Sequence, residues 1–248
     1  MSDIKFGTDG WRARIGEDYT FDNVRRVAQG FAEYLRRHEL AEQGVVIGYD
    51  QRFSSDLFAE AAAEVMAGND IEGWLTKGNA PTPVISYSVV ERGAGGAINI
   101  TASHNPPPDN GFKVRDPQGG AIAPDGLREI ESYIPYTMEA VHRMPLAEAE
   151  ETSLVRRWDP KPAYVEHISK LVDLDALRNA GFKILVEPMW GNAAGWYVDL
   201  LSGGTNTIEQ IHAGRNPLFP GMERPEPIPP NIDAALERTV EIGADVLL

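Results

Sequence analysis

The chain has 248 residues and is 42% hydrophobic, enough for one large core or two smaller ones. It contains no cysteine, which excludes disulfides and thiolate metal sites and fits a reducing cytoplasm. Its formal net charge of −14 argues against non-specific nucleic-acid binding, which depends on clustered Lys and Arg.

The first residues, MSDIKFGTDGW, lack a basic segment followed by an apolar stretch, so we predict no secretory signal. No apolar run is long enough to span a bilayer, so we predict no membrane contact and a cytoplasmic location. If the ligand is an anion, cationic side chains must be concentrated locally against the acidic average.

Strands and helices alternate along the first part of the chain. Residues 23–35 place apolar side chains at helical spacing, with Thr20 or Asp22 as the N-cap. A second helix over 56–68 is expected to close at Gly68. The other predicted elements are strands over 44–50, 72–78, 95–102 and 111–116 and a helix over 83–93. This alternation predicts βαβ units and a mainly parallel sheet.

The alternation is interrupted around residues 116–160, which are rich in turns, charges and proline and are interpreted as a link between domains. A second alternation follows, with helices over 163–181, 193–204 and 231–244, strands over 182–188, 205–212 and 245–248, and a Pro/Gly-rich loop over 213–230. We therefore predict an α/β protein of two successive three-layer α/β/α domains, 1–150 and 151–248, with mixed, mainly parallel sheets. The second is expected to be incomplete, because the chain stops in a strand whose carboxyl end should carry functional groups.

The segment ITASHNPPPDNGFKV, residues 100–114, gathers the chemistry-bearing side chains. Ser103 follows a predicted strand, and a serine is a poor nucleophile unless a base or a metal activates it. His104 and Lys113 are candidate bases, and Asn105 can orient a group. A Ser-His-Asp hydrolase matches poorly, because neighbouring side chains on extended backbone point to opposite faces, and G-x-S-x-G is absent.

A phosphorylated Ser103 fits the surrounding residues better. A phosphoserine carries a charge of about −1.5 to −2 and needs cations and hydrogen-bond donors nearby. Lys113 and Arg115 follow in the chain, and Arg12 and Arg14 stand in the glycine-rich segment FGTDGWRARIG. These four residues are the local basic patch that an anionic ligand requires.

Each of these signals also has a purely structural interpretation. The SHN tripeptide is typical of a turn in which Ser and Asn cap the backbone. His104 could be a surface histidine, and Arg52 a surface cation at a helix start. Lys113 and Arg115 alternate on a predicted strand and could form its solvated face. The functional interpretation depends on the combination.

Four segments in this order, FGTDGWR, GYDQRFSS, NAPTPV and TASHNPPPDNGFKV, resemble the α-D-phosphohexomutases, the phosphoglucomutase/phosphomannomutase superfamily. The resemblance continues through FKILVEPMWGNAAG and NPLFPGMERPEPIPPNI, so it covers essentially the whole chain. Two positions depart from the family pattern, Ala13 in place of glycine and Glu187 in place of aspartate; Glu187 is interpreted as structural.

The resemblance implies a role for each matching residue. Ser103 would be phosphorylated and donate its phosphoryl group to a hexose phosphate, with a hexose 1,6-bisphosphate as intermediate. His104 and Asn105 would shape the site, Lys113 would act as general acid/base or charge stabiliser, and Arg12 would contact the phosphoryl group. Positioning and neutralisation of the phosphoryl oxygens are the main requirements of such a transfer.

The resemblance also implies an isomerase that interconverts hexose 1-phosphate and hexose 6-phosphate, with glucose or mannose phosphate as substrate. It implies Mg²⁺, held by a Ser103 hydroxyl or phosphoryl oxygen and by three aspartates expected beyond residue 248. The remaining domains 3 and 4 of a full-length protein are implied as partners, and we expect the 248 residues alone to be inactive. Two alternatives remain: a non-catalytic sugar-phosphate-binding or regulatory module, and a phosphatase with water as the acceptor.

Overall fold

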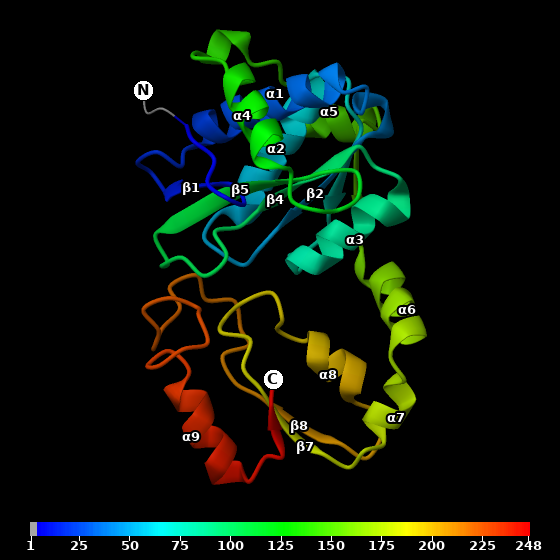
Figure 1. The fold of residues 1–248 in the computed structure, drawn as a ribbon, viewed down its shortest axis with the longest axis vertical. Helices are drawn as coiled ribbons and strands as arrows, with labels where there is room; N and C mark the ends of the chain where they lie inside the picture. Colours follow the sequence, from blue (N-terminus) through cyan, green and yellow to red (C-terminus); the bar gives the residue numbers. More distant parts are fainter. Residues whose placement is uncertain (1–3) are drawn as a thin grey trace. The chain divides into compact units, whose positions relative to one another are not determined.

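A computed structural model describes residues 4–248. The chain divides into two compact units (Figure 1). The first runs to Ala102 and from Pro108 to Pro160; the second comprises Ser103–Pro107 and Lys161–Leu248. The units change over at residue 160, whereas the sequence analysis places the domain boundary at 150.

The first unit is built on a six-stranded sheet in the order β1-β5-β4-β2-β3-β6. Its strands are β1 Trp11–Arg14, β2 Val45–Tyr49, β3 Gly73–Thr76, β4 Gly96–Ile100, β5 Asp109–Arg115 and β6 Val155–Trp158. The four strands β4, β2, β3 and β6 run parallel, and β5 and β1 are antiparallel to their neighbours. The predicted mixed, mainly parallel sheet is therefore confirmed. Buried apolar runs such as β2 are typical of strands covered on both faces.

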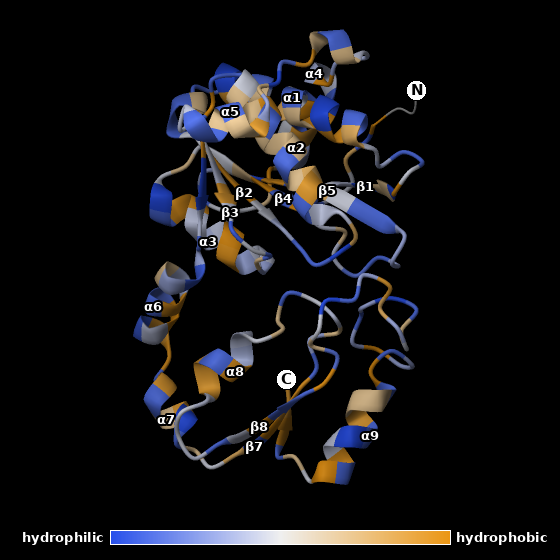
Figure 2. Cartoon of the chain, turned by 180° about the vertical axis from the view of Figure 1, so that it is seen from behind, coloured by the Kyte–Doolittle hydropathy of each residue, from blue (hydrophilic) through white to orange (hydrophobic). Residues whose placement is uncertain are grey.

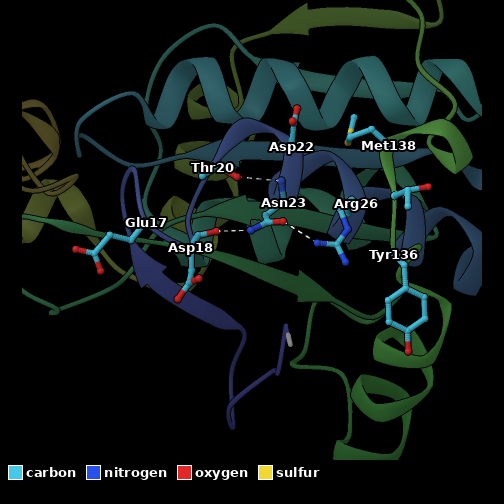
Figure 3. A pocket seen from close by; sticks show the side chains of 9 residues that line it. Glu17, Asp18, Thr20, Asp22, Asn23, Arg26, Tyr136 and Met138 are labelled. Atoms are coloured by element: carbon cyan, nitrogen blue, oxygen red, sulfur yellow. Dashed lines mark hydrogen bonds between the residues drawn. The ribbon is translucent and has the colours of Figure 1, made fainter. Parts of the chain in front are cut away.

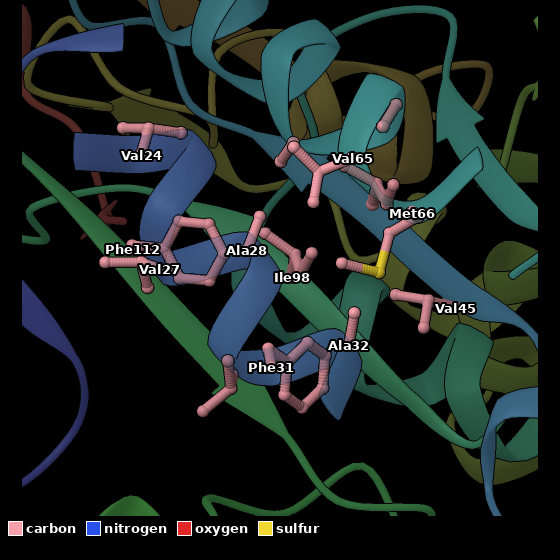
Figure 4. Close-up of a cluster of buried hydrophobic side chains, with 14 of the residues drawn as sticks. Val24, Val27, Ala28, Phe31, Ala32, Val45, Val65, Met66, Ile98 and Phe112 are labelled. Atoms are coloured by element: carbon pink, nitrogen blue, oxygen red, sulfur yellow. The ribbon is translucent and has the colours of Figure 1, made fainter. Parts of the chain in front are cut away.

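Helices cover both faces of this sheet (Figure 1). The helices α1 Phe21–Arg37, α2 Ser55–Gly68, α4 Pro124–Tyr133 and α5 Leu146–Glu151 lie together on one face, and α3 Thr82–Arg92 lies on the other. The main core forms between α1, α2 and the strands, where Val27, Phe31 and Ile98 are completely buried (Figure 4). Thr20 is the N-cap of α1, and its hydroxyl oxygen accepts from the Asn23 amide at 3.2 Å.

Gly68 is the last residue of α2, as predicted, and its backbone is not left-handed. Its role is steric. A Cβ at residue 68 would lie 2.4 Å from the Arg143 Cα, so glycine lets the segment around Arg143 pass close over α2. The same segment is fixed by the buried side chains of Gln29 and Asn69, which bond one another and the backbone of His142.

The stretch 116–160 is not a linker; it belongs to the first unit. It contains α4, the short 3₁₀ helix Met138–Ala140, α5 and β6, which pairs with β3 through Val155 and Gly73. The charged residues that indicated a link lie on the exposed sides of these elements. Arg157, for example, pairs with Glu60 and Glu150 at the surface.

The second unit has a smaller sheet, in the order β8-β7-β9, with all strands parallel. Its elements are α6 Lys161–Leu171, α7 Leu174–Arg178, β7 Lys183–Val186, α8 Trp196–Leu201, β8 Thr207–Gln210, α9 Asp233–Ile242 and β9 Val246–Leu247. The single helix predicted over 163–181 is two helices, because Asp173 caps α7 by accepting from the Ala176 amide at 2.9 Å. Apolar residues of this unit lie mainly on β7, on β9 and on parts of the helices, which the hydropathy colouring of Figure 2 shows.

One short element completes the first unit, the 3₁₀ helix Ala41–Gln43 before β2. Within the described part of the chain, we find no helix with both the length and the apolar character needed to cross a membrane.

Candidate active site

One face of the β1–β5 pair carries the basic side chains. Trp11 and Phe112 pair across the two strands and belong to the core, so the alternate residues face away from it. Arg12 stands opposite Gly111, and Lys113 lies two residues further along β5. Glycine is required at 111, because a Cβ there would lie 2.5 Å from the Thr101 carbonyl oxygen and 3.1 Å from Arg12 Cγ.

Lys113 and Arg115 meet at a carboxylate that the sequence analysis missed. Lys113 Nζ donates to Asp9 Oδ2 at 2.7 Å, and Arg115 Nη1 donates to Asp9 Oδ1 at 2.6 Å. Both cationic side chains are only 7% exposed, so their interpretation as a solvated strand face is wrong. The signal that could have found Asp9 is its position between two glycines in GTDG, a typical tight turn.

The two cations change the acidity of Asp9. Partial burial by itself raises its pKa, but hydrogen bonds from Arg115 and Lys113, together with their charges, outweigh burial. The pKa of Asp9 therefore lies below its ordinary value, and the carboxylate stays ionised near neutrality.

Ser103 lies in the exposed loop that follows β4. Its backbone is left-handed, with φ of 58°, and its Oγ is 3.4 Å from His104 Nδ1. The expectation that the two side chains point to opposite faces is wrong, because Ser103 is not extended. A distance of 3.4 Å is long for a hydrogen bond, so it is a weak contact. Asn105 is half-buried in the same loop.

The base of this loop is held by a shared carbonyl. The Gly111 carbonyl oxygen accepts from the Thr101 amide at 2.9 Å and from the Tyr19 hydroxyl at 2.8 Å. Tyr19 is completely buried; its burial, assisted by the charge of Asp50, raises the pKa of its hydroxyl well above the ordinary value. Tyr19 therefore remains a protonated donor to the strand that carries Lys113.

Arg52 ties the end of β2 to the start of β5. It is 2% exposed, its Nη1 donates to the Asp109 carbonyl at 3.1 Å, and its Nε is 3.3 Å from Asp50 Oδ2. It is therefore not the surface cation of the structural interpretation. Burial lowers the pKa of Arg52. The negative charges of Asp50 and Asp109 raise this pKa in part, and the positive charge of Arg12 lowers it further.

Among the predicted site residues, Ser103 and His104 make a weak side-chain contact. Lys113 and Arg115 share the Asp9 carboxylate. Arg12 pairs with Gly111 across the two strands. Arg14 does not join them: its side chain is 62% exposed and lies 3.4 Å from Glu17.

Glu187, one of the two departures from the family pattern, is buried after β7. Its Oε1 accepts from the Met189 amide at 2.7 Å, and its Oε2 is 2.5 Å from His212 Nδ1. Met189, Trp190 and His212 all have left-handed backbone conformations. This geometry supports the structural interpretation of Glu187. Ala13, the other departure, packs against the first unit's core.

A separate cavity of about 330 Å³ lies at the start of α1 (Figure 3). Glu17, Asp18 and Asp22 line it, so it does not suit an anion. Its buried cation, Arg26, donates to Asn23 Oδ1 at 2.8 Å and to the Pro135 carbonyl at 2.6 Å.

A metal site needs several ligand side chains close together. Among residues 4–248 there is no group of three or more His, Asp or Glu side chains that could hold a metal ion. The hydroxyl or phosphoryl oxygen of Ser103 is the candidate ligand that the sequence analysis named.

Comparison with known proteins shows which family the chain belongs to. Residues 3–140 match the family model of phosphoglucomutase/phosphomannomutase alpha/beta/alpha domain I, and residues 162–248 match that of domain II. The chain belongs to this family. Its members form the α-D-phosphohexomutase superfamily, so the resemblance seen in the sequence is confirmed.

Phosphohexomutase relatives cover nearly the whole chain. The probable phosphoglucosamine mutase of Methanothermobacter thermautotrophicus is 30% identical over 97% of this chain and 50% of its own length. The phosphoglucomutase of Komagataeibacter xylinus is 29% identical over 80% of this chain and 38% of its own. The crystal structure of a phosphomannomutase-type protein from Thermus thermophilus has a TM-score of 0.84 at 32% identity, covering 96% of this chain and 52% of that one. The chain therefore spans about half the length of the relatives it matches.

Proposed function

We propose that this chain carries the phosphoserine and the proton-transfer or charge-stabilising group of a phosphohexomutase, an isomerase that interconverts hexose 1-phosphate and hexose 6-phosphate. One observation carries the proposal. In a member of this family, Ser103 occupies an exposed left-handed turn directly after β4, and the adjoining strand pair β1–β5 carries Arg12 and Lys113 on one face. This arrangement supplies a phosphoryl carrier and cations, the two requirements of phosphoryl transfer.

The proposed chemistry needs two transfers. In the first, the bond between phosphorus and Ser103 Oγ breaks and a bond between phosphorus and a sugar hydroxyl oxygen forms. The proton of that sugar hydroxyl ends on Ser103 Oγ, which restores the serine hydroxyl. The hexose 1,6-bisphosphate then returns its other phosphoryl group to Ser103. Arg12 would neutralise phosphoryl oxygens, and His104 and Asn105 would shape the loop. Lys113, ion-paired with Asp9, suits the role of charge stabiliser.

The substrate is proposed as a class. The relatives' names include phosphoglucomutase, phosphomannomutase and phosphoglucosamine mutase, so we propose hexose phosphates, with glucose and mannose phosphate as first candidates. Because these relatives are about twice as long, we propose that the complete reaction also needs domains that correspond to their other half. Mg²⁺ belongs to the proposal as well, with an oxygen of Ser103 as one ligand. The described residues include no group of three His, Asp or Glu side chains that could complete its site.

The first test is mass spectrometry with peptide mapping of a protein that joins this chain to the domains matching the relatives' other half, after incubation with hexose 1,6-bisphosphate and Mg²⁺. We expect one phosphoryl group on the peptide that contains Ser103. Ser103→Ala should abolish it, and Ser169→Ala, at an exposed serine of α6, should not. A chain that remains unphosphorylated under these conditions would contradict the proposal.

The products separate the alternatives. A mutase returns an isomerised sugar phosphate, whereas a phosphatase releases inorganic phosphate. A binding module holds the sugar phosphate without any phosphoryl group on Ser103.

A further inference from the structure

Asp9, Lys113 and Arg115, here called the Asp9 cluster, share a single carboxylate between two cations. Each carboxylate oxygen of Asp9 accepts from a different cation, at 2.7 Å and 2.6 Å. The cations are nearly buried, at 7% exposure each, and Asp9 is 35% exposed. Two cations against one carboxylate leave one positive charge on the cluster.

The turn before β1 places the Asp9 carboxylate next to β5. The Gly7 amide donates to the Gly10 carbonyl at 2.9 Å, which closes a tight turn around Asp9. Gly10 has φ of 119°, and a Cβ there would lie 2.7 Å from the Phe112 carbonyl oxygen and 2.9 Å from Lys113 Cγ. Glycine therefore lets the turn lie flat on β5, and Asp9 reaches a lysine 104 positions away in sequence.

We propose that Asp9 is a positioning residue that fixes the ammonium group of Lys113, and that Arg115 holds Asp9 in place through its other oxygen. A lysine side chain has a flexible four-carbon stem, so its charge is localised only if a partner fixes it. Charge-assisted hydrogen bonds are strong enough to do so. The ammonium group has three N–H donors, so Lys113 can bind a phosphoryl oxygen while it stays on Asp9. The consequence for catalysis rests on the proposed function, whereas the positioning itself does not.

The test measures the amine reactivity of Lys113 in the 248-residue chain. An amine-labelling reagent is applied at fixed pH, and the rate at each lysine is read by peptide mass spectrometry. We expect Asp9→Asn to raise the rate at Lys113 about ten-fold, since the charged acceptor of the ammonium group is replaced by a neutral amide. Arg115→Met should raise it less than about two-fold, because the bond from Lys113 to Asp9 remains. Glu166→Gln, which breaks the surface pair of Lys170, is the matched control and should change Lys170 alone.

A merely structural role for Asp9 predicts something else. Loosening of the turn would raise Lys113 labelling equally in Asp9→Asn and Arg115→Met. Equal rates in the two variants, or an unchanged rate in Asp9→Asn, would overturn the proposal. Asp9→Glu, which keeps the carboxylate, should restore slow labelling at least in part.

Phosphorylation of Ser103 by hexose 1,6-bisphosphate gives a second readout, measured in the longer protein that also contains the domains matching the relatives' other half. Asp9→Asn should lower its maximal rate about ten-fold and leave the half-saturating concentration nearly unchanged, since Asp9 acts through Lys113. If no variant becomes phosphorylated while Lys113 still labels faster in Asp9→Asn, the proposed function fails and the positioning stands. If Ser103 is phosphorylated at the same rate in Asp9→Asn as in the unmutated protein, the positioning of Lys113 by Asp9 has no consequence for catalysis.

Discussion

Gly111 lets the Arg12 side chain cross β5 at close range. A Cβ at this position would lie 2.5 Å from the Thr101 carbonyl oxygen, a backbone atom that cannot rotate away. We expect Gly111→Ala to lower the free energy of unfolding by about 1–3 kcal/mol, as overpacking does. Gly78→Ala is the control, because nothing lies within 4 Å of its added Cβ, and it should stay within about 0.5 kcal/mol. Urea denaturation measures both; equal stabilities would contradict the argument.

The Asp9 carboxylate should make stability depend on acid pH. Its pKa is lower in the folded chain than its ordinary value of 3.8, so its stabilising effect is fully present above that value. The effect is lost as the pH falls through the folded pKa, when the native carboxylate also takes up a proton. We expect Asp9→Asn to be less stable than the original chain near neutrality and the difference to shrink in acid. Urea midpoints across the acid range test this, and a difference that grows in acid would contradict it.

At the scale of elements, α1 offers a clean comparison of two candidate caps. From the sequence, either Thr20 or Asp22 could be the N-cap. In the structure, the hydroxyl oxygen of Thr20 accepts from the Asn23 amide. Thr20→Ala should therefore lower the free energy of unfolding by about 1 kcal/mol, the usual effect of losing an N-cap. Asp22→Ala should have a smaller effect, about a few tenths of a kcal/mol, through the helix dipole and the weak pair with Arg25. Equal losses in chemical denaturation would mean that the hydroxyl does not act as the cap.

The elements that the sequence predicted well are those whose apolar pattern is local. The helix of residues 23–35 and the buried strand of 44–50 match α1 and β2, because periodicity and β-branched runs report burial directly. β6 was missed because Val155 is followed by two arginines, and its pairing with β3 depends on residues far away in sequence. The break between α6 and α7 depends on one side chain, Asp173, within an otherwise helical pattern.

The candidate site was likewise predictable only in part. Ser103, His104, Asn105 and Lys113 stand within one segment, so a motif could identify them. Asp9 could not be paired with Lys113 from sequence, because the contact joins residues 104 positions apart through a glycine turn. Nor does a sequence reveal that Ser103 is left-handed, since that conformation is imposed by the surrounding loop.

At the scale of the whole molecule, the net charge is negative although the strand pair β1–β5 carries several cationic side chains. The chain carries a formal charge of −14, yet Arg12, Lys113 and Arg115 lie on one face of β1 and β5. Net charge therefore argues against non-specific polyanion binding without excluding a small anionic ligand. The cavity at the start of α1 is acidic like the chain as a whole, whereas the strand pair is basic.

The two units should differ in local stability. β4 lies between β2 and β5, and all five of its residues are buried; β7 lies between two short strands and begins with an exposed residue. In the second unit, α6 has no buried residue, and an apolar cavity of about 340 Å³ lies against β7 and β9. Because opening free energy follows buried apolar contact, we expect amides of β7 to exchange with solvent at least about ten-fold faster than those of β4.

Hydrogen exchange followed by mass spectrometry compares peptides over 183–186 and 96–100 in the same sample. Phe31→Ala, in the first unit's core, should raise exchange in β4, and Leu185→Ala, in the second unit's, should raise exchange in β7. Equal protection of the two strands in the unmutated chain would show that the smaller core is as cooperative as the larger one. It would also show that the exposed apolar residues of the second unit do not lower its stability.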